Sequence, residues 1–407
     1  MSEPQRYDVC IVGAGLVGLA VGTALVESHP GISLLVLEKE ARVAAHQSSH
    51  NSGVVHSGLY YRPGSLKARL CAEGRDAVYQ WCADAGIGFR RSGKLVVATR
   101  RSELPALDEL ERRGRANGLT GLIRLDGAGI ADFEPAATGL AALHVPEAGV
   151  ADYPALAAHL AARLESTGAR VATSRAVTVI THEVAGVAVV AGGERFGARV
   201  LVNCAGLHSD RVAAMAGIDT PIRIVPFRGE YYRLAEPAAG LVRALVYPVP
   251  DPRFPFLGVH FTRRIDGTVE VGPNAVLALG REHYRGTPRV WSEVRAVVTG
   301  RGFRRLALRH WRSGLQELIT SRSPRRYARL AQRLVPAITA ADLLPGGSGV
   351  RAQAVGPDGA LIDDFVIEAA GSTIHVLNAP SPGATASPAI GRHVAALVSP
   401  WLGRQGR

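Results

Sequence analysis

The 407-residue sequence has few cysteines, and they follow no metal-ligand spacing. The four are Cys10, Cys71, Cys82 and Cys204, and none of them belongs to a CxxC pair. Cys10 and Cys204 lie inside apolar runs, as reduced core cysteines do. The cysteine content therefore argues against a metal site and against a disulfide-stabilised secreted fold, and it fits a cytoplasmic protein.

We also expect no secretion signal, and a long uninterrupted apolar run is missing. The N-terminal residues MSEPQRYD contain no basic region ahead of an apolar core. The longest apolar stretch, residues 11–26, is interrupted by glycines, so we do not expect it to span a membrane. With 47% hydrophobic and 20% charged residues, the composition is that of a soluble globular protein long enough for two packed units.

Lysine is absent from residues 281–333, although this segment carries most of the positive charge of the chain. It holds fourteen arginines and three acids, which gives +11 of the total net charge of +12. We expect helices over residues 288–335, with apolar side chains interleaved among the arginines. These apolar residues are Trp291, Val294, Val298, Phe303, Leu306, Trp311, Leu315 and Leu318.

Two interpretations of this basic segment stay open. One is an amphipathic surface that docks peripherally on anionic lipid, at the inner face of the cell membrane. The other is an ordinary solvated face of an arginine-rich protein. A nucleic-acid-binding protein, which a net charge of +12 suggests, would also carry an RNP-like, zinc-finger or helix-turn-helix pattern, and none is present. We therefore expect no nucleic acid partner.

Residues 7–38 contain the pattern of a dinucleotide fold. An apolar run (residues 9–12) precedes a turn with Gly13, Gly15 and Gly18, and a small-residue helix and a second apolar run follow. In such a fold the three glycines allow the tight turn, the approach of a pyrophosphate, and close packing of helix on strand. Glu38, at the end of the second run, is placed to bind the ribose hydroxyls, which favours FAD or NAD over NADP.

The rest of the chain indicates an α/β protein with two interleaved domains. The helix and strand patterns of residues 152–206 return to the nucleotide domain after an excursion, as in two-domain flavoproteins rather than NAD dehydrogenases. We predict a discontinuous Rossmann-like FAD-binding domain from residues 1–85, 151–219 and 345–407. Residues 86–150 and 220–344 would form a substrate domain, built on a mixed or antiparallel sheet with helices.

Four stretches carry a resemblance to a known family: SSHNSGVVHSGLYYRPGSLKARLC, VPDPRFPFLGVHFTRRIDGTVEVGPNAVLA, SGVRAQAV and NAPSPGATASPAIG. They resemble the FAD-dependent D-amino-acid-oxidase-like superfamily and, within it, the L-2-hydroxyglutarate oxidase/dehydrogenase family. The resemblance implies oxidation of L-2-hydroxyglutarate to 2-oxoglutarate, with hydride transfer to N5 of FAD. The alternative is a related flavin dehydrogenase or oxidase for glycerol 3-phosphate or an amino acid. The electron acceptor, oxygen or a membrane quinone, stays open.

Several further residues are candidates to bind the cofactor. The loop after the nucleotide motif offers Ser48, Ser49 and Gly53 for the pyrophosphate or the flavin, and Val177 could reach the adenine through its backbone. A helix is expected to begin near residue 383 and to direct its N-terminus at the flavin ring. The candidates there are Ser381, Gly383, Ala384 and Thr385. His50, in HNSG, loosely fits the position of a covalently attached flavin, although a non-covalent loop histidine is the simpler interpretation.

Oxidation of a hydroxy acid needs a base and cations for the carboxylates. His260 and His56 are the candidate bases, because histidine accepts protons near neutral pH. Arg351, in GVRA, is the candidate to bind a carboxylate with two parallel hydrogen bonds. A diacid has a second carboxylate, for which the candidates are Tyr60, Tyr61, Arg62 and Arg228, with Lys67 and Arg69 as further cations that we do not rank.

Overall fold

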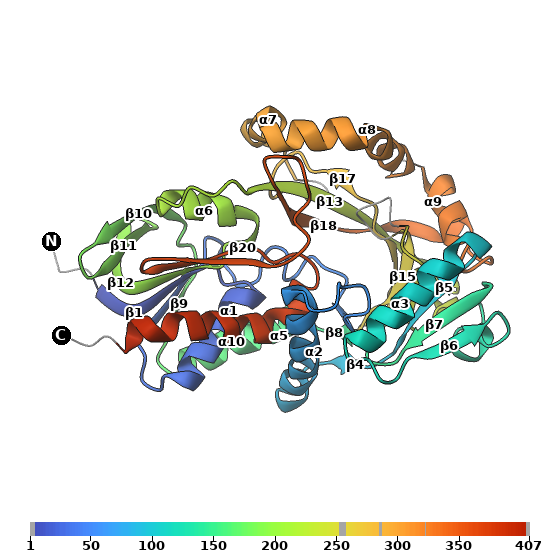
Figure 1. The fold of residues 1–407 in the computed structure, drawn as a ribbon, viewed down its shortest axis with the longest axis horizontal. Helices are drawn as coiled ribbons and strands as arrows, with labels where there is room; N and C mark the ends of the chain where they lie inside the picture. The colour runs from blue at the N-terminus through green and yellow to red at the C-terminus, as the bar shows by residue number, and fades with distance from the viewer. Residues whose placement is uncertain (1–4, 252–257, 285–286, 322, 404–407) are drawn as a thin grey trace.

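The structure is a computed structural model that describes residues 5–251, 258–284, 287–321 and 323–403. Residues 252–257, which belong to the predicted substrate domain, lie outside the described residues, as do Arg285 and Arg322 of the basic segment. Figure 1 shows two lobes side by side, one around an eight-stranded sheet and the other around a nine-stranded sheet.

The first lobe is built on a sheet with a parallel centre. Strands β9, β2, β1, β12 and β20 lie next to one another in this order and run parallel, and the hairpin β10–β11 and strand β19 extend the sheet. Its strands are β1 (Gln5–Val12), β2 (Leu34–Leu37), β9 (Arg170–Ala172), β10 (Val177–Glu183), β11 (Gly186–Ala191), β12 (Glu194–Asn203), β19 (Val366–Ala370) and β20 (Thr373–Asn378).

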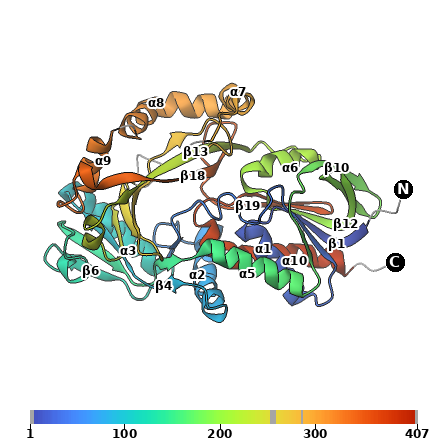
Figure 2. The same cartoon turned by 180° about the vertical axis from the view of Figure 1, so that it is seen from behind.

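Both faces of the central strands of this sheet are apolar, so both faces are covered. Val9 and Ile11 of β1 pack among α1, α2, α5 and α10, whereas Cys10 and Val12 face residues of α6 and of the hairpin β10–β11 on the other side. Figure 2 shows α1, α5 and α10 running together beneath the strands. The helices of this lobe are α1 (Leu16–Ser28), α2 (Leu66–Asp84), α5 (Tyr153–Ser166), α6 (Ser209–Met215) and α10 (Gly383–Leu402).

Parallel pairing brings four strand ends to one edge of the sheet. The carboxyl ends of β1, β2, β12 and β20 meet there, because parallel strands end on the same side. The residues that follow these strands are Gly13, Glu38, Cys204 and Ala379. Ligands of such sheets bind outside the carboxyl ends of the strands, so this edge is where the predicted nucleotide turn has to act.

The second lobe carries a mixed sheet of order β17-β13-β16-β15-β14-β5-β7-β6, with β18 paired to β13. Its neighbours are antiparallel except for β14 and β5, which run parallel. The strands are β5 (Lys94–Ala98), β6 (Ile123–Asp126), β7 (Ala141–Val145), β13 (Arg223–Leu234), β14 (Leu245–Pro248), β15 (His260–Arg263), β16 (Val269–Gly272), β17 (Val276–Leu277) and β18 (Leu343–Val355).

A small sheet and several helices complete the molecule. The small sheet has the order β3-β8-β4 and consists of β3 (Val54–Val55), β8 (Gly149–Ala151) and β4 (Phe89–Arg90). The helices are α3 (Leu104–Ala116), α4 (Ile130–Phe133), α7 (Trp291–Thr299), α8 (Arg301–Ser321) and α9 (Pro324–Ala331). Single 3-10 turns are η1 (Arg101–Glu103), η2 (Gly206–His208), η3 (Ala238–Leu241) and η4 (Ala340–Asp342). In Figure 1, α7 and α8 run along the outer edge of the molecule above β13 and β17.

The predicted fold class is confirmed: a Rossmann-like α/β lobe is joined to a second lobe with a mixed sheet and helices. The domain boundaries stay a prediction. The predicted boundary at residue 345 falls within β18, which pairs along its length with β13 of the second sheet. The predicted basic helices of residues 288–335 correspond to α7, α8 and α9.

Candidate active site

A cavity of about 860 Å³ lies between the two lobes. Its walls come from the carboxyl edge of the first sheet, from the loop of residues 44–56, and from strands β13, β14, β15 and β18 of the second sheet. Most ligand cavities hold 300–1,000 Å³, so this one is large enough for an extended cofactor with a small substrate.

The glycine turn opens on this cavity. Gly13 has a φ of +104°, and a Cβ atom there would lie 2.6 Å from the carbonyl oxygen of Cys204. A Cβ atom on Gly18 would overlap the carbonyl oxygen of Gly13, so α1 can pack on the strand end only without a side chain. Gly13 and Gly15 line the cavity, whereas Gly18 supports the turn from behind.

Glu38 is buried at the end of β2 and lines the cavity. Its carboxylate accepts hydrogen bonds from the backbone N–H groups of Ala14, at 2.9 Å, and of Glu40, at 3.0 Å. These bonds fix the carboxylate beside the glycine turn and leave each oxygen one further lone pair for a ribose hydroxyl.

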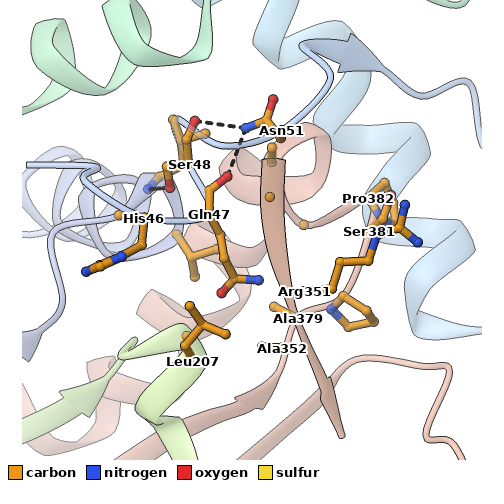
Figure 3. Close-up of a pocket in the computed structure, with 18 of the residues that line it drawn as sticks. His46, Gln47, Ser48, Asn51, Leu207, Arg351, Ala352, Ala379, Ser381 and Pro382 are labelled. Atoms are coloured by element: carbon orange, nitrogen blue, oxygen red, sulfur yellow. Dashed lines mark hydrogen bonds between the residues drawn. The ribbon is translucent and has the colours of Figure 1, made fainter. Parts of the chain in front are cut away.

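The loop after β2 supplies a side chain to the start of α1. Ser48 lines the cavity, and its Oγ accepts a hydrogen bond of 2.9 Å from the N–H of Leu16. Figure 3 shows this loop, with Asn51 donating to the carbonyls of Gln47 and Ser48 at 3.0 and 2.8 Å. Ser49 and Gly53 lie behind it and line a separate small polar pocket instead.

A second helix begins at the cavity. The predicted residues Ser381, Gly383, Ala384 and Thr385 all line the cavity at the start of α10. The first backbone bond of this helix runs from Ala386 to Pro382, and the N–H of Gly383 donates to Pro380, so the N–H groups of Ala384 and Thr385 have no partner within the helix. The buried Thr385 hydroxyl accepts from the N–H of His56 at 3.1 Å, which ties α10 to the loop. Val177, at the start of β10, lines the cavity as well.

His260 is held in the tautomer that a base requires. Its Nδ1 donates to the carbonyl of Gly258 at 2.8 Å, and because a carbonyl only accepts, Nε2 carries the lone pair of the neutral ring. The ring stacks on Tyr247 at 3.9 Å between centroids. The pKa of His260 is lowered to about 3, chiefly by burial; the bond to Gly258 opposes this shift, and the nearby cations Lys94 and Arg351 add to it. Neutral His260 therefore faces the cavity throughout the physiological pH range.

His56 also lines the cavity, but its ring is engaged differently. Nε2 lies 3.2 Å from the hydroxyl of Ser381, and Nδ1 is buried without a partner among the described residues. Burial holds the pKa of His56 well below its usual range, and the charges of Lys94 and of a protonated His260 act in the same direction. Both candidate histidines are thus neutral and border one space.

Arg351 of β18 points its guanidinium into the cavity. It lies beside Ser381 and Pro382 in Figure 3 and forms a hydrogen bond with Tyr231. Burial raises the pKa of Tyr231, against the neighbouring charge of Arg351, so this phenol stays protonated. The structure thereby brings the cation Arg351 close to the two neutral histidines, as the predicted site for a hydroxy acid requires.

The residues predicted for the second carboxylate fall into two groups. Tyr60, Tyr61 and Lys67 line the cavity, and the Lys67 ammonium contacts the carboxylate of Asp363 at 2.8 Å. Among the described residues, the cavity lining does not include Arg62, Arg69 or Arg228. Arg62 is exposed, and Arg228 contacts Glu230 at 2.8 Å and donates to His283 at 2.8 Å.

Sequence reasoning missed three residues around His260. Tyr231 and Tyr247 line the cavity, and Lys94 lies buried behind Tyr60 and Tyr247. The tyrosines are indistinguishable from core residues of alternating strands in the sequence. The signal that could have found Lys94 is the scarcity of lysine in a chain otherwise rich in arginine.

His50 lines the cavity, as the covalent-flavin hypothesis requires, but nothing in the structure tests a bond to flavin. Its Nδ1 donates to the carbonyl of Ser348 at 3.2 Å, and its ring stacks on Tyr284 at 4.2 Å between centroids. Protein denatured in acid would retain its colour if the attachment existed, and a colourless pellet would contradict it.

The cavity fits a flavin dinucleotide at several points. A Cβ atom on Gly15 would lie 3.1 Å from the Ser48 oxygen, so a side chain would close the approach to the start of α1. Two helix N-termini, of α1 and α10, open on the same space and favour negative charge. Tyr60 Oη and Asn378 Oδ1 are buried at its walls and lack partners within the described part of the chain. Gly15 and Ser48 would hold the diphosphate, Glu38 the ribose, and residues 381–385 the ring.

The four cysteines are free and buried, as expected for reduced core residues. Glu40, His46 and Glu282 come close enough together to be considered as a metal site. However, the ammonium of Lys39 already occupies the space between them, in contact with Glu40 and at 2.6 Å from Glu282. Lys39 therefore already binds both carboxylates of the cluster.

Comparisons with known proteins show the family of the chain. The model of the FAD dependent oxidoreductase family matches residues 8–397. The chain is 45% identical to L-2-hydroxyglutarate dehydrogenase of Indibacter alkaliphilus over 95% of this chain and 97% of that protein. It is 42% identical to the Escherichia coli K12 enzyme of that name (98% and 94% covered) and 41% identical to the human mitochondrial one (97% and 89%).

Solved structures agree on the fold. L-α-glycerophosphate oxidase of Mycoplasma pneumoniae, a structure with FAD bound, superposes with a TM-score of 0.78 at 23% identity, covering 97% of this chain and 95% of that one. Glycine oxidase of Geobacillus kaustophilus gives 0.70 at 21% identity, with 97% and 95% covered. From its sequence, its fold and its cavity, the chain belongs to the FAD-dependent oxidoreductase family and, within it, to the L-2-hydroxyglutarate dehydrogenases.

Proposed function

We propose that the protein oxidises L-2-hydroxyglutarate to 2-oxoglutarate with FAD as its cofactor. The names of its relatives support this substrate, and the family supports the cofactor. One structural observation carries the proposal: a neutral histidine with an available Nε2 and an arginine border the same cavity as the dinucleotide turn. A base, a carboxylate-binding cation and a flavin site are the three parts that oxidation of a 2-hydroxy acid needs.

Arg351 binds the carboxylate next to the reacting carbon. The guanidinium presents two parallel N–H groups to a carboxylate, and the bond to Tyr231 limits its rotation. Because Arg351 belongs to β18, which pairs with β13 along its length, its position is fixed by the second sheet. A substrate held in this way cannot slide along the cavity, so its hydroxyl group stays near the two histidines.

His260 accepts the hydroxyl proton at Nε2. The electron pair of the O–H bond then forms the second bond of the keto group, and the α-hydrogen leaves the carbon with its own pair. FAD held in this cavity would supply the acceptor for this hydride. His56 is the alternative base. It is the weaker candidate because its Nε2 is already engaged by Ser381, whereas Nε2 of His260 has no such bond within the described residues.

The second carboxylate of the substrate is bound by Tyr60, Tyr61 and Lys67. All three line the cavity, and the Lys67 ammonium lies 5.0 Å from the centroid of the Tyr61 ring. Lys67 is 5% exposed, and its partner Asp363 lies at the edge of the cavity with an almost fully exposed side chain. A substrate carboxylate can therefore share the ammonium with Asp363.

Anaerobic mixing of the FAD-loaded protein with the two enantiomers of 2-hydroxyglutarate tests the proposal. We expect the L enantiomer to bleach the flavin absorbance and the D enantiomer to leave it unchanged. Glycerol 3-phosphate and a panel of L-amino acids serve as controls for the alternative substrates. Bleaching by one of these controls, with none by L-2-hydroxyglutarate, would contradict the proposal.

We further infer that the outer face of α8 docks on anionic lipid. Leu308, Trp311 and Leu315 follow one another at helical spacing, and their side chains are 78%, 59% and 50% exposed. A helix that only packs on its own protein buries such a stripe. Exposed arginines, among them Arg309 and Arg312, flank it and match the charge of an anionic headgroup. None of the described helices is both long enough and apolar enough to cross a bilayer.

Sedimentation with vesicles tests this surface. We expect binding to anionic vesicles at low salt, weaker binding at high salt, and little binding to neutral vesicles. The variant Leu308→Ser/Trp311→Ser should lose the binding and keep its flavin, because both side chains point into solvent. Val184→Ser is the control, because Val184 is an exposed apolar residue in the hairpin turn of the first lobe. Leu306 of α8 is buried and would not serve this purpose. Absence of binding to anionic vesicles at low salt would remove the lipid partner.

A further inference from the structure

Lysine is rare in this chain, and its few positions are all at the cavity. The sequence has three lysines and forty-four arginines. Lys39 and Lys67 line the cavity, and Lys94 is buried behind two of its lining tyrosines. A chain that otherwise uses arginine for its positive charge thus places a lysine at each of these three points. Lysine differs from arginine in one relevant property: burial can remove its proton.

Two of the three lysines have carboxylate partners. Lys39 contacts Glu40 and Glu282, and Lys67 contacts Asp363. Lys94 has none: no described carboxylate lies within ion-pair distance of its ammonium. Lys94 is the first residue of β5 and is only 1% exposed. A buried charge without a partner costs several kcal/mol, so this position is poorly suited to a permanent cation.

Two aromatic rings separate Lys94 from the cavity. Its Nζ lies 4.2 Å from the centroid of the Tyr247 ring and 5.1 Å from that of Tyr60. Tyr247 stacks on His260, and the buried hydroxyl of Tyr60 lacks a partner within the described chain. The rings attract a cation but do not neutralise it. A negative charge placed in the cavity against Tyr60 would attract the ammonium of Lys94 across these two rings.

The other titratable groups that face Lys94 carry no negative charge at neutral pH. His56 of the loop and His260 of β15 are neutral because burial lowers their pKa values. Cys71 of α2 stays a thiol because burial raises its pKa to about 12, and the phenol of Tyr60 is protonated for the same reason. Burial accordingly lowers the pKa of Lys94 to about 7. Without a ligand, Lys94 therefore gives up its proton more readily than an exposed lysine.

We propose that Lys94 selects substrates with two negative charges, and that it takes up a proton when such a substrate binds. The inference rests on the proposed function and specifies its substrate class. Lys94 does not touch the substrate. It acts across the rings of Tyr60 and Tyr247, so it is a positioning and specificity residue rather than a catalytic one. A ligand with one carboxylate at Arg351 leaves Lys94 without a partner, whereas a diacid provides the missing charge.

The protonation of Lys94 can be observed directly because the chain has three lysines. In FAD-loaded protein labelled with ¹³C at the lysine ε-carbon, Lys94→Met assigns the Lys94 signal. We expect this signal to titrate near neutral pH without ligand, and at least one pH unit higher with 2-oxoglutarate. The monoacid 2-oxovalerate has the same chain length and should leave the titration nearly unchanged. Lys39, whose carboxylate partners raise its pKa, serves as the internal control.

Binding of the same two ligands tests the selectivity. At pH 6.5 we expect Lys94→Met to weaken the binding of 2-oxoglutarate about tenfold and the binding of 2-oxovalerate less than about twofold. Only the diacid places a second negative charge near Nζ. Flavin absorbance changes on ligand addition measure both affinities. Lys94→Arg cannot lose its charge. It should keep the preference for the diacid up to pH 9, where the preference of the natural protein declines.

Each result supports or overturns the proposal. An unchanged preference for the diacid in Lys94→Met overturns the proposal. An equal loss of affinity for both ligands also overturns it, because it would show that Lys94 only contributes to packing. If the natural protein binds 2-oxoglutarate and responds to L-2-hydroxyglutarate, these outcomes leave the proposed function intact. A natural protein that binds neither ligand and is not reduced by L-2-hydroxyglutarate overturns the proposed function, and the inference with it.

Discussion

The tautomer of His260 decides how the activity should depend on pH. The bond from Nδ1 to Gly258 leaves Nε2 unprotonated, and burial lowers the pKa of the ring to about 3. A base with a lowered pKa stays competent until the pH falls close to that value. The usual loss of activity below pH 6.5, which an unperturbed histidine would cause, should therefore be missing.

We predict that the rate of flavin reduction at saturating L-2-hydroxyglutarate is constant between pH 8 and pH 5. His260→Asn should lower this rate by about 10²–10⁴-fold because the proton acceptor is lost. Rapid-mixing absorbance measurements over this pH range give both results. The comparison variant is His56→Asn, for which a smaller loss is expected. A larger loss in His56→Asn would assign the base to His56, and a protonation step near pH 6.5 would contradict a base whose pKa is lowered by burial.

Arg351 and Arg228 form a matched pair of arginines on neighbouring strands. Arg351 lines the cavity, whereas Arg228 is occupied by Glu230 and His283 outside its lining. We predict that Arg351→Ala lowers kcat/KM for L-2-hydroxyglutarate by about 10²–10³-fold, the loss typical of a buried charge partner. Arg228→Ala should change it by less than about fivefold. Steady-state kinetics with a dye acceptor measure both, and the absorbance of bound flavin confirms that FAD remains in place. Equal effects would contradict the assignment of Arg351.

The predicted residues that lie at the cavity include those that belong to a recognisable sequence pattern. Arg351 follows a Gly-Val pair in a loop-like stretch, and His56 lies in a polar segment next to the nucleotide motif, so both stand out from their surroundings. Lys94 and Tyr247 do not, because each is a single residue in an apolar strand. Their importance depends on β5 and β14 lying side by side, and no local pattern encodes this pairing of distant segments.

At the scale of elements, the contact between α1 and β1 depends on a missing side chain. Gly18 faces the carbonyl oxygen of Gly13, and a Cβ atom would overlap it. The helix can yield only by moving away from the strand, which would shift the amides at its start away from the cavity. The geometry of the turn and the packing of the helix are therefore one structural feature.

We predict that Gly18→Ala lowers the free energy of unfolding by about 2 kcal/mol or more, as overpacking does, and weakens FAD binding. Gly314→Ala is the matched control, because Gly314 also lies within a helix and a Cβ atom there would meet no atom within 4 Å. It should raise the stability by about 0.5–1 kcal/mol, since alanine favours helix. Urea unfolding and flavin fluorescence titration measure the two effects. Retention of FAD and stability in Gly18→Ala would show that the turn tolerates a shift.

Elements were predictable where the hydrophobic period and the capping residues agree. Residues 152–206 are predicted to contain helices and strands of the nucleotide domain. In this stretch α5 begins after Asp152, whose side chain accepts a bond of 3.0 Å from the N–H of Ala155. Strand β12 extends back to Glu194 because it also pairs with β11. That extension and the pairing of β18 with β13 depend on partners far along the chain, which a local pattern does not reveal.

At the scale of the whole molecule, a buried ion pair joins the two lobes. Arg281 follows β17 of the second sheet, and Asp210 lies in α6, which packs on the first sheet. Their side chains are 8% and 5% exposed, and Arg281 Nη2 donates to Asp210 Oδ2 at 2.9 Å. Burial raises the pKa of Asp210, but the bonds from Arg281 outweigh this and hold it below its usual value. Arg281 also donates to the carbonyl of Leu207, which lines the cavity.

We predict that Asp210→Asn destabilises the protein by about 3–5 kcal/mol, because Arg281 would remain buried without a charge partner. The double variant Asp210→Asn/Arg281→Met should recover much of the loss, since it removes the unpaired cation as well. Glu27→Gln removes an exposed pair with Arg163 instead and should cost less than about 1 kcal/mol. Urea unfolding followed by circular dichroism gives these values.

The same variant shows whether this ion pair also holds the cavity closed around the cofactor. Arg281 links Leu207 and α6 to the second sheet. A displaced Arg281 side chain should therefore loosen the contact between the two lobes at the wall of the cavity. We therefore expect Asp210→Asn to release FAD at a lower temperature than that at which its circular dichroism changes, and the natural protein to lose both together. Flavin fluorescence recorded during heating separates the two events. Coincident transitions in both proteins would mean that the ion pair stabilises the fold without controlling how the lobes enclose the flavin.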